Sequence, residues 1–211
     1  ELHRRTQRPH VVILGAGASV AAMPSGDANG NRLPVMNNLV KVLGLEKVIQ
    51  GAGHDPTLGF ESLYSKIHKN DPSSLVLKEI EARVEGYFGA LVLPSQLTVY
   101  DHLLLSLREK DAIFTFNWDP FLADTYDRYE KAGIPLPSIF HLHGNVRVHV
   151  CVKCGESSRP AAACPQCGGP LHPSRLLYPI EQKDYASDGF IRSQWDAARA
   201  YIRDAVIITI F

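Results

Sequence analysis

The sequence predicts an α/β fold, in which a parallel sheet carries helices on both faces and is extended by a helical insertion and a small cysteine module. Short apolar runs with many β-branched residues alternate with helical segments, and this alternation is typical of buried parallel strands. One long stretch, about 45–108, has helical periodicity and forms the insertion. All four cysteines lie within residues 151–167, which sets the module apart.

The composition is that of a globular protein, with 211 residues, of which 45% are apolar and 21% are charged. These values exclude a disordered tail, a collagen-like repeat and a coiled coil. The 22 basic and 22 acidic residues balance, so the charge gives no support to a nucleic-acid or membrane partner. No apolar run reaches the roughly 18 residues of a membrane span, and residues 1–10 lack the apolar core of a signal peptide. We therefore expect a cytoplasmic protein.

The first half of the chain is expected to hold one strand and then mostly helix. Residues 10–14, HVVIL, form a buried strand that stops at a glycine turn. Residues 22–34 contain many turn residues and predict a long loop, which a helix over 35–43 follows. Within 45–108 the aromatic residues recur at helical spacing, so we interpret them as helix core.

The second half alternates strand and helix again. Strands are expected at 112–116, 139–142 and 205–211, and helices at 119–132 and 195–203. Residues 1–145 and 174–211 then form one domain, and residues 146–173 form the cysteine module. Because a buried strand would end the sequence, we expect the sequence to be a fragment of a longer protein.

A glycine turn after the first strand has the features of a phosphate-binding loop. It consists of Gly15, Ala16, Gly17, Ala18 and Ser19. Gly15 can take a tight turn, Gly17 lets the backbone approach a pyrophosphate, and the amides that follow would face the anion. Position 20 is Val, so the full GxGxxG pattern is absent and a plain strand-to-helix turn is the alternative.

Polar residues follow the second and third strands, at the edge where parallel sheets bind ligands. Asn117 and Asp119 can hold an amide or a sugar hydroxyl there; alternatively, Asp119 caps the next helix and Asn117 satisfies a turn. His143 can act as a base near pH 7, and Gly144 after it leaves space for a ligand. We choose His143 over His141 because it lies nearer the edge; a structural histidine or a His-x-His metal pair is the alternative.

The cysteines have the spacing of a structural zinc site. Cys151 and Cys154 form one CxxC pair, and Cys164 and Cys167 form a second. Each pair can fold as a knuckle that offers two thiolates to one ion. Four thiolates complete the zinc tetrahedron and leave no open position, so we expect this zinc ribbon to be structural rather than catalytic.

The order of these motifs resembles the sirtuin (SIR2-like) family. A glycine turn, an Asn-x-Asp segment, a His-Gly pair and a four-cysteine module follow one another in that family, as GAGAS, TFNWD, HLHG and CVKC with CPQCGG do here. The resemblance spans residues 11–211, with 45–108 unmatched. It implies a Rossmann-like domain, a small zinc-bearing domain and NAD bound in the cleft between them.

The resemblance also implies roles for individual residues. Asn117 and Asp119 would lie at the nicotinamide ribose and the carboxamide, and His143 would be the general base. The NAD phosphates and ribose would be held by Gly15, Ala16, Gly17, Ala18 and Ser19. Sirtuins cleave the nicotinamide–ribose bond through an oxocarbenium-like state, and nicotinamide leaves neutral. Such a site needs oriented hydroxyls, a base and exclusion of water.

Three departures from the protein deacylases of the family bear on the substrate. The chain lacks their Phe-Arg pair after GAGxS, has Phe116 where they have Gln, and reads SRLLYPIEQKDYASDG where they have a Phe-Gly-Glu segment. These differences resemble divergent bacterial SIR2-like proteins, several of which hydrolyse NAD, often in antiphage defence. We therefore expect an NAD+ hydrolase. An NAD-dependent protein deacylase and a non-catalytic NAD or ADP-ribose sensor are the alternatives.

The partners expected from this resemblance are NAD+ as substrate, a structural zinc ion, and a homo-oligomer or a partner protein of a defence system. We expect neither nucleic acid nor a membrane among them. Because constant NAD hydrolysis would be toxic to the host, we also expect an inhibited resting form in which the loop 22–34 covers the cleft.

Overall fold

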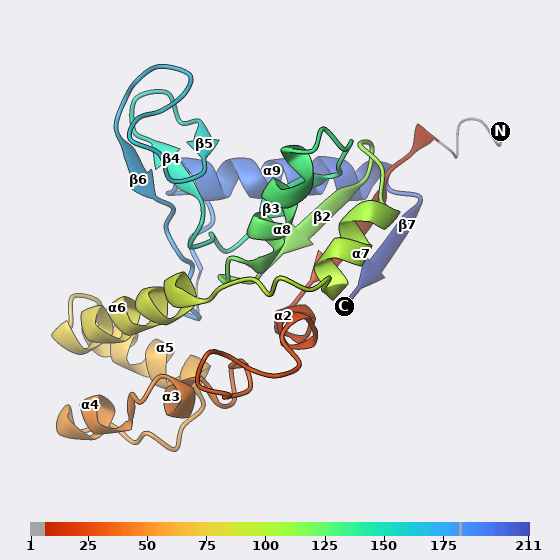
Figure 1. Ribbon diagram of the computed structural model, residues 1–211. Helices are drawn as coiled ribbons and strands as arrows, with labels where there is room; N and C mark the ends of the chain where they lie inside the picture. Colours follow the sequence, from red (N-terminus) through yellow and green to blue (C-terminus); the bar gives the residue numbers. More distant parts are fainter. Residues whose placement is uncertain (1–6, 182) are drawn as a thin grey trace.

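The computed structural model describes residues 7–181 and 183–211 (Figure 1). Its centre is a four-stranded parallel sheet in the order β3-β2-β1-β7. The strands are β1 (His10–Leu14), β2 (Ala112–Thr115), β3 (Ser138–His141) and β7 (Ile207–Ile210). Each strand lies within two residues of its expected limits, and the parallel α/β fold class is confirmed.

Helices cover both faces of this sheet because alternate side chains of each strand point to opposite faces. Val12 and Leu14 of β1 pack in one core with α2 (Ala16–Ala22), α7 (Val99–Ser106) and α8 (Phe121–Glu130). Val11 packs on the other face with α9 (Gly189–Asp204). This last helix begins earlier than expected because the Asp188 side chain accepts the backbone N–H of Ile191 and caps it.

The helical insertion has a core of its own. It consists of α3 (Leu39–Val42), α4 (Glu46–Gly51), α5 (Phe60–Asn70) and α6 (Leu75–Ala90), and α7 then returns to the sheet. Phe60 and Tyr64 are buried among these helices, which confirms them as helix core, and Trp118 from the sheet domain packs against them. The helix expected over 35–43 is only α3, because the Asn38 side chain accepts the Val35 N–H and closes a turn.

The cysteine module is a separate antiparallel sheet of β4 (His149–Cys151), β5 (Ser157–Ser158) and β6 (Leu171–Pro173). Arg159 holds it to α8, because its Nε lies 2.8 Å from Oδ1 of Asp127. Figure 1 shows the module at the upper left and helices α3–α6 at the lower left of the sheet. The domain limits at 145 and 174 stay a prediction.

No helix in the described part of the chain has the length and hydropathy of a membrane span.

Candidate functional site

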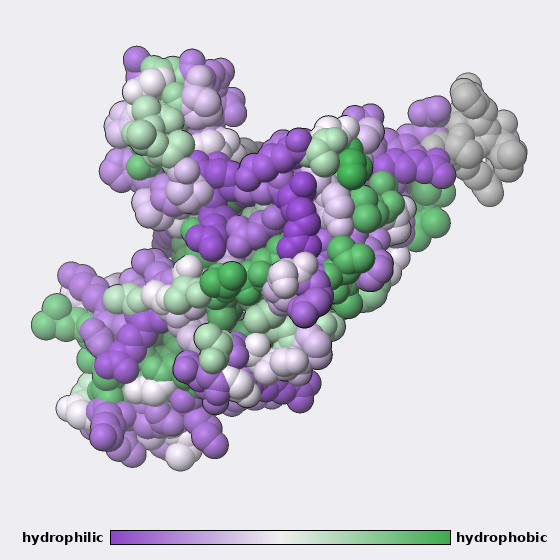
Figure 2. All heavy atoms as spheres, viewed as in Figure 1, coloured by the Kyte–Doolittle hydropathy of each residue, from purple (hydrophilic) through white to green (hydrophobic). Residues whose placement is uncertain are grey.

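A cavity of about 290 Å³ lies at the carboxyl ends of β1, β2 and β3. Ala16 and Ser19 border it after β1, residues 116–119 after β2, and His143 after β3. The rest of its wall is formed by Leu33, Pro34, Val35, Met36, Leu39, Glu61, Phe88, Leu177, Pro179 and Lys183. Figure 2 shows that the outline of the molecule is indented between the cysteine module and the helical insertion. The structure thus brings Ser19, Asn117, Asp119 and His143 to one cavity.

The glycine turn is less strained than expected. Gly15 precedes α2 in an extended conformation (φ −109°, ψ −173°) that any residue can adopt. Its carbonyl oxygen accepts the N–H of Ala18 at 3.1 Å, so a tight turn does begin here, but it does not need a glycine. Its N–H donates to the carbonyl oxygen of Phe211 at 3.0 Å, and Gly17 lies within α2. A Cβ at Gly17 would meet no atom within 4 Å. Open space beside Gly17 is compatible with a close-lying ligand, and phosphate binding by residues 15–19 stays a prediction.

Asn117 is buried, and its amide nitrogen is fully occupied by protein groups. Nδ2 donates to the carbonyl oxygen of Gly15 at 2.9 Å and to Oγ of Ser19 at 2.9 Å. An amide nitrogen carries two hydrogens, so none is left for a ligand. The group that Asn117 can offer to the cavity is therefore its carbonyl oxygen, which accepts a hydrogen bond from a hydroxyl or from water.

Asp119 is buried beside Asn117 and bonds the backbone at the start of α8, as its helix-capping interpretation predicts, whereas its role toward a ligand stays a prediction. Oδ2 accepts the Ser19 hydroxyl at 2.5 Å, while Oδ1 accepts the N–H of Phe121 at the start of α8, at 3.2 Å. Burial raises the pKa of Asp119 to about 6, although the bond from Ser19 opposes this shift. At neutral pH the carboxylate is ionised and accepts both bonds.

His143 faces the same cavity from the turn after β3. Its ring lies edge-on to Phe116, with the ring centroids 4.8 Å apart. Burial lowers the pKa of His143 to about 4, and the charge of Lys183 lowers it further in the same direction. The imidazole is therefore neutral near pH 7 and can accept a proton. Phe116, the residue that departs from the deacylase pattern, holds this ring in place.

Gly144 has a different role from the one expected. Its φ of +76° is in the left-handed region, and a Cβ would overlap the carbonyl oxygen of Arg175. The space at Gly144 is therefore taken by the chain segment around Arg175 rather than kept for a ligand. This close approach lets the N–H of Leu177 donate to the carbonyl oxygen of His143 at 2.9 Å.

His141 lies in a different environment from His143. It is buried and lines a second cavity, beneath the cysteine module, and burial lowers its pKa to about 3. Among the described residues, the cysteine cluster is the one group of three or more side chains that could hold a metal ion together. His141 and His143 line different cavities, which argues against a His-x-His metal pair and favours a structural role for His141.

Two residues beside the site were not predicted from the sequence. Tyr100, from α7, places its hydroxyl 2.8 Å from Oγ of Ser19. Asn145 donates from Nδ2 to the carbonyl oxygens of Asp119 at 2.7 Å and of Asn117 at 3.3 Å. The His-Gly-Asn sequence places Asn145 next to the candidate base, which is a weak signal, whereas Tyr100 lies in a helix with no motif.

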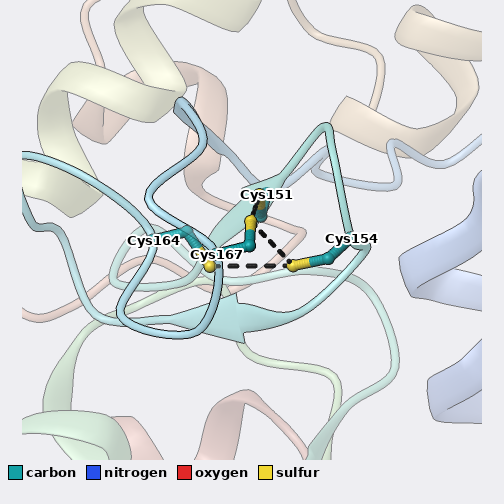
Figure 3. Close-up of side chains that lie close together, drawn as sticks. All are labelled: Cys151, Cys154, Cys164 and Cys167. Carbon is teal, nitrogen blue, oxygen red and sulfur yellow. Dashed lines mark hydrogen bonds between the residues drawn. The ribbon is translucent and has the colours of Figure 1, made fainter.

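The four cysteines converge on one point (Figure 3), with their sulfur atoms all within 4.8 Å of one another. Three of the Sγ–Sγ distances are 3.4, 3.5 and 3.7 Å, near the roughly 3.8 Å edge of a tetrahedron with Zn–S bonds of about 2.3 Å. A Cβ at Gly169 would lie 3.1 Å from Sγ of Cys151, so this glycine makes room for the cluster. The residues therefore fit a zinc ion held by Cys151, Cys154, Cys164 and Cys167.

Solved structures similar to this chain are SIR2 homologues. One, a SIR2 homologue in complex with NAD, is 18% identical over 99% of this chain and 70% of that chain, with a TM-score of 0.47. Another, a mutant Sir2 homologue with 2′-O-acetyl ADP-ribose, is 19% identical over 100% of this chain and 73% of that chain, with a TM-score of 0.44. No protein-family model matches the chain, and no curated protein matches it.

Proposed function

We propose that this protein is a SIR2-like NAD-utilising enzyme, and that its reaction is the hydrolysis of NAD+ to nicotinamide and ADP-ribose. One observation carries the proposal: the Asn117 side chain, with only its carbonyl oxygen free, and the neutral imidazole of His143 line the same cavity. This pair supplies the two groups that a glycosidic cleavage without a strong acid requires, namely an acceptor that orients a hydroxyl and a base.

The cavity has the size and lining for the nicotinamide–ribose half of NAD. A volume of about 290 Å³ is at the lower limit of small-molecule sites, and it is too small for the whole dinucleotide. Apolar side chains such as Phe88, Phe116 and Leu177 form much of its wall and would exclude bulk water. The adenine half would then extend past Ser19 and the glycine turn.

In the proposed reaction the bond between ribose C1′ and the nicotinamide nitrogen breaks, and its electron pair stays with nicotinamide, which leaves neutral. Asn117 Oδ1 accepts a hydrogen bond from a ribose hydroxyl or from the attacking water. The water oxygen bonds to C1′, and an imidazole nitrogen of His143 takes its proton. A base with a pKa of about 4 suffices, because water that attacks an oxocarbenium-like carbon becomes strongly acidic.

The zinc ion proposed for the cysteine module takes no part in this reaction. When bound, it supplies a structural cross-link, because four thiolates fill its coordination sphere. The module itself contributes to the site through the segment that follows it, which brings Leu177 and Lys183 to the cavity.

The test is nicotinamide release from NAD+, measured with and without an acetyl-lysine peptide. Hydrolysis predicts release without peptide, and Asn117→Ala and His143→Ala should each abolish it. His141→Gln is the matched control, since this histidine lies two residues from His143 but lines another cavity. Release only with peptide would support the deacylase, and NAD binding without release would support the sensor. If turnover survives both substitutions, the roles given to Asn117 and His143 are wrong.

We also propose that the resting enzyme is restrained by the loop 22–34. Leu33 and Pro34 at the end of this loop border the cavity, so the loop is placed to limit access. Removal of residues 24–31 should then raise nicotinamide release, and unchanged release would contradict the proposal. A role in antiphage defence predicts that cells carrying the protein survive phage better than cells carrying its Asn117→Ala variant.

A further inference from the structure

Tyr100 lies behind the candidate site, in the helix α7, and is 1% exposed. Its ring belongs to the core between α7 and the sheet, but its hydroxyl reaches the polar residues at the carboxyl ends of β1 and β2. The hydroxyl oxygen is 2.8 Å from Oγ of Ser19 and 3.3 Å from Nδ2 of Asn117. Tyr100 thus touches two residues of the site without lining the cavity.

The direction of the hydrogen bonds follows from the valence of Ser19. The Ser19 hydroxyl has one hydrogen, and it donates this hydrogen to the Asp119 carboxylate, which can only accept. In the contact between Ser19 and Tyr100, the tyrosine must therefore be the donor. The two lone pairs of Ser19 Oγ are then occupied by the Tyr100 O–H and by an Asn117 N–H.

This arrangement fixes the Asn117 amide. If the amide turned over, its carbonyl oxygen would face Ser19, Tyr100 and the carbonyl oxygen of Gly15. It would find no free donor there, because the Ser19 hydrogen is held by Asp119 and the Tyr100 hydrogen is held by Ser19. Tyr100 completes the set of bonds that keeps Ser19 pointing toward Asp119. Without its hydroxyl, Ser19 keeps its bonds to Asp119 and Asn117 but loses one of three buried hydrogen bonds, so its position is held less firmly.

We propose that Tyr100 is a positioning residue, which holds Ser19 and thereby fixes the Asn117 amide with its carbonyl oxygen toward the ligand cavity. The proposal rests on the proposed function, since it assigns the Asn117 oxygen to the hydroxyl of a bound ribose. It adds a residue from outside every motif of the sequence to the machinery of the site.

The experiment compares Tyr100→Phe with Tyr129→Phe. Tyr129 is a matched control because its hydroxyl also donates to α7, to the Asp101 carboxylate one residue after Tyr100, but outside this network. Equilibrium binding of ADP-ribose and of AMP is measured by calorimetry, and nicotinamide release from NAD+ is measured in parallel. AMP lacks the second ribose, so its affinity reports on the rest of the site.

Tyr100→Phe should weaken ADP-ribose binding about five- to tenfold, which is the effect of one buried hydrogen bond, and slow nicotinamide release at least as much. AMP affinity should stay unchanged, and Tyr129→Phe should change none of the three quantities. In the Asn117→Ala background, Tyr100→Phe should add no further loss of ADP-ribose affinity, because the two residues act as one unit.

Unchanged ADP-ribose affinity and rate in Tyr100→Phe would overturn the proposal. An equal loss of AMP and ADP-ribose affinity would also overturn the proposal, because Tyr100 would then merely support the fold. A wild-type protein that binds no ADP-ribose would overturn it as well. If the wild-type protein releases no nicotinamide but Tyr100→Phe selectively weakens ADP-ribose binding, the proposed hydrolysis fails while the role of Tyr100 stands.

Discussion

Gly144→Ala should destabilise the protein more than any other single methyl group added near the site. The left-handed backbone at Gly144 (φ +76°) costs alanine about 1 kcal/mol. The new Cβ would also overlap the carbonyl oxygen of Arg175 and lie 2.9 Å from its carbonyl carbon, so a backbone segment must move, at about 1–3 kcal/mol. Together these effects should lower the free energy of unfolding by about 3 kcal/mol, which corresponds to a melting temperature lower by about 6–12 °C for a chain of this length.

The matched control for this substitution is Gly133→Ala. Gly133 has a similar φ of +70°, but a Cβ there would meet no atom within 4 Å. It therefore isolates the cost of the backbone conformation, about 1 kcal/mol. Melting temperatures are compared by differential scanning calorimetry, together with nicotinamide release. If Gly144→Ala melts within about 2 °C of Gly133→Ala, the close approach of Arg175 does not stabilise the fold as argued.

Three further predictions concern pH, metal and the attachment of the cysteine module. Nicotinamide release should fall as the pH drops below about 6, because a protonated Asp119 carboxyl accepts the hydrogen of Ser19 more weakly than the carboxylate does. Since the pKa of His143 is about 4, a fall that begins only near pH 4 would instead implicate the histidine alone. Mass spectrometry should find one zinc ion per chain. Removal of the ion with a chelator should unfold β4–β6, because the module is too small to fold without it, and circular dichroism and proteolysis would detect the unfolding. A metal-free chain whose module still resists proteolysis would contradict this. Arg159→Ala should lower the free energy of unfolding by about 1 kcal/mol and raise proteolysis between the module and α8, because it removes a partly exposed ion pair with Asp127. The control Arg199→Ala removes a more exposed ion pair and should change neither quantity. Equal effects of the two substitutions would show that Arg159 does not hold the module.

The sheet and the central site residues could be predicted because they depend on local sequence. The strands β1, β2 and β3 are short, largely apolar runs that end at or just before a glycine or polar residue, and adjacent parallel strands bring their carboxyl ends together. Asn117 after β2 and His143 after β3 therefore had to lie near one another. The cysteines follow the same logic, since their spacing alone predicts a common ion.

The rest depended on contacts between distant residues, which no local pattern records. Ser19 and Tyr100 are 81 positions apart, and the tyrosine sits on a helix whose spacing indicates only core. The start of α9 depends on a bond from the Asp188 side chain, and the end of the loop before α3 depends on Asn38. Gly144 could not be assigned to Arg175 because the two residues lie on either side of the cysteine module in the sequence, and no local pattern indicates their contact.

Asn145 connects the cysteine module mechanically to the residues proposed for catalysis. The chain crosses between the sheet and the module twice, and at this joint the Asn145 backbone N–H and carbonyl both bond to the Ser174 hydroxyl, at 3.1 and 2.9 Å. The Asn145 side chain also donates hydrogen bonds to the backbone carbonyl oxygens of Asn117 and Asp119. A displacement of the module at this joint would therefore be passed to the backbone of Asn117 and Asp119 through the Asn145 side chain and through the bond from the Val146 N–H to the Trp118 carbonyl oxygen.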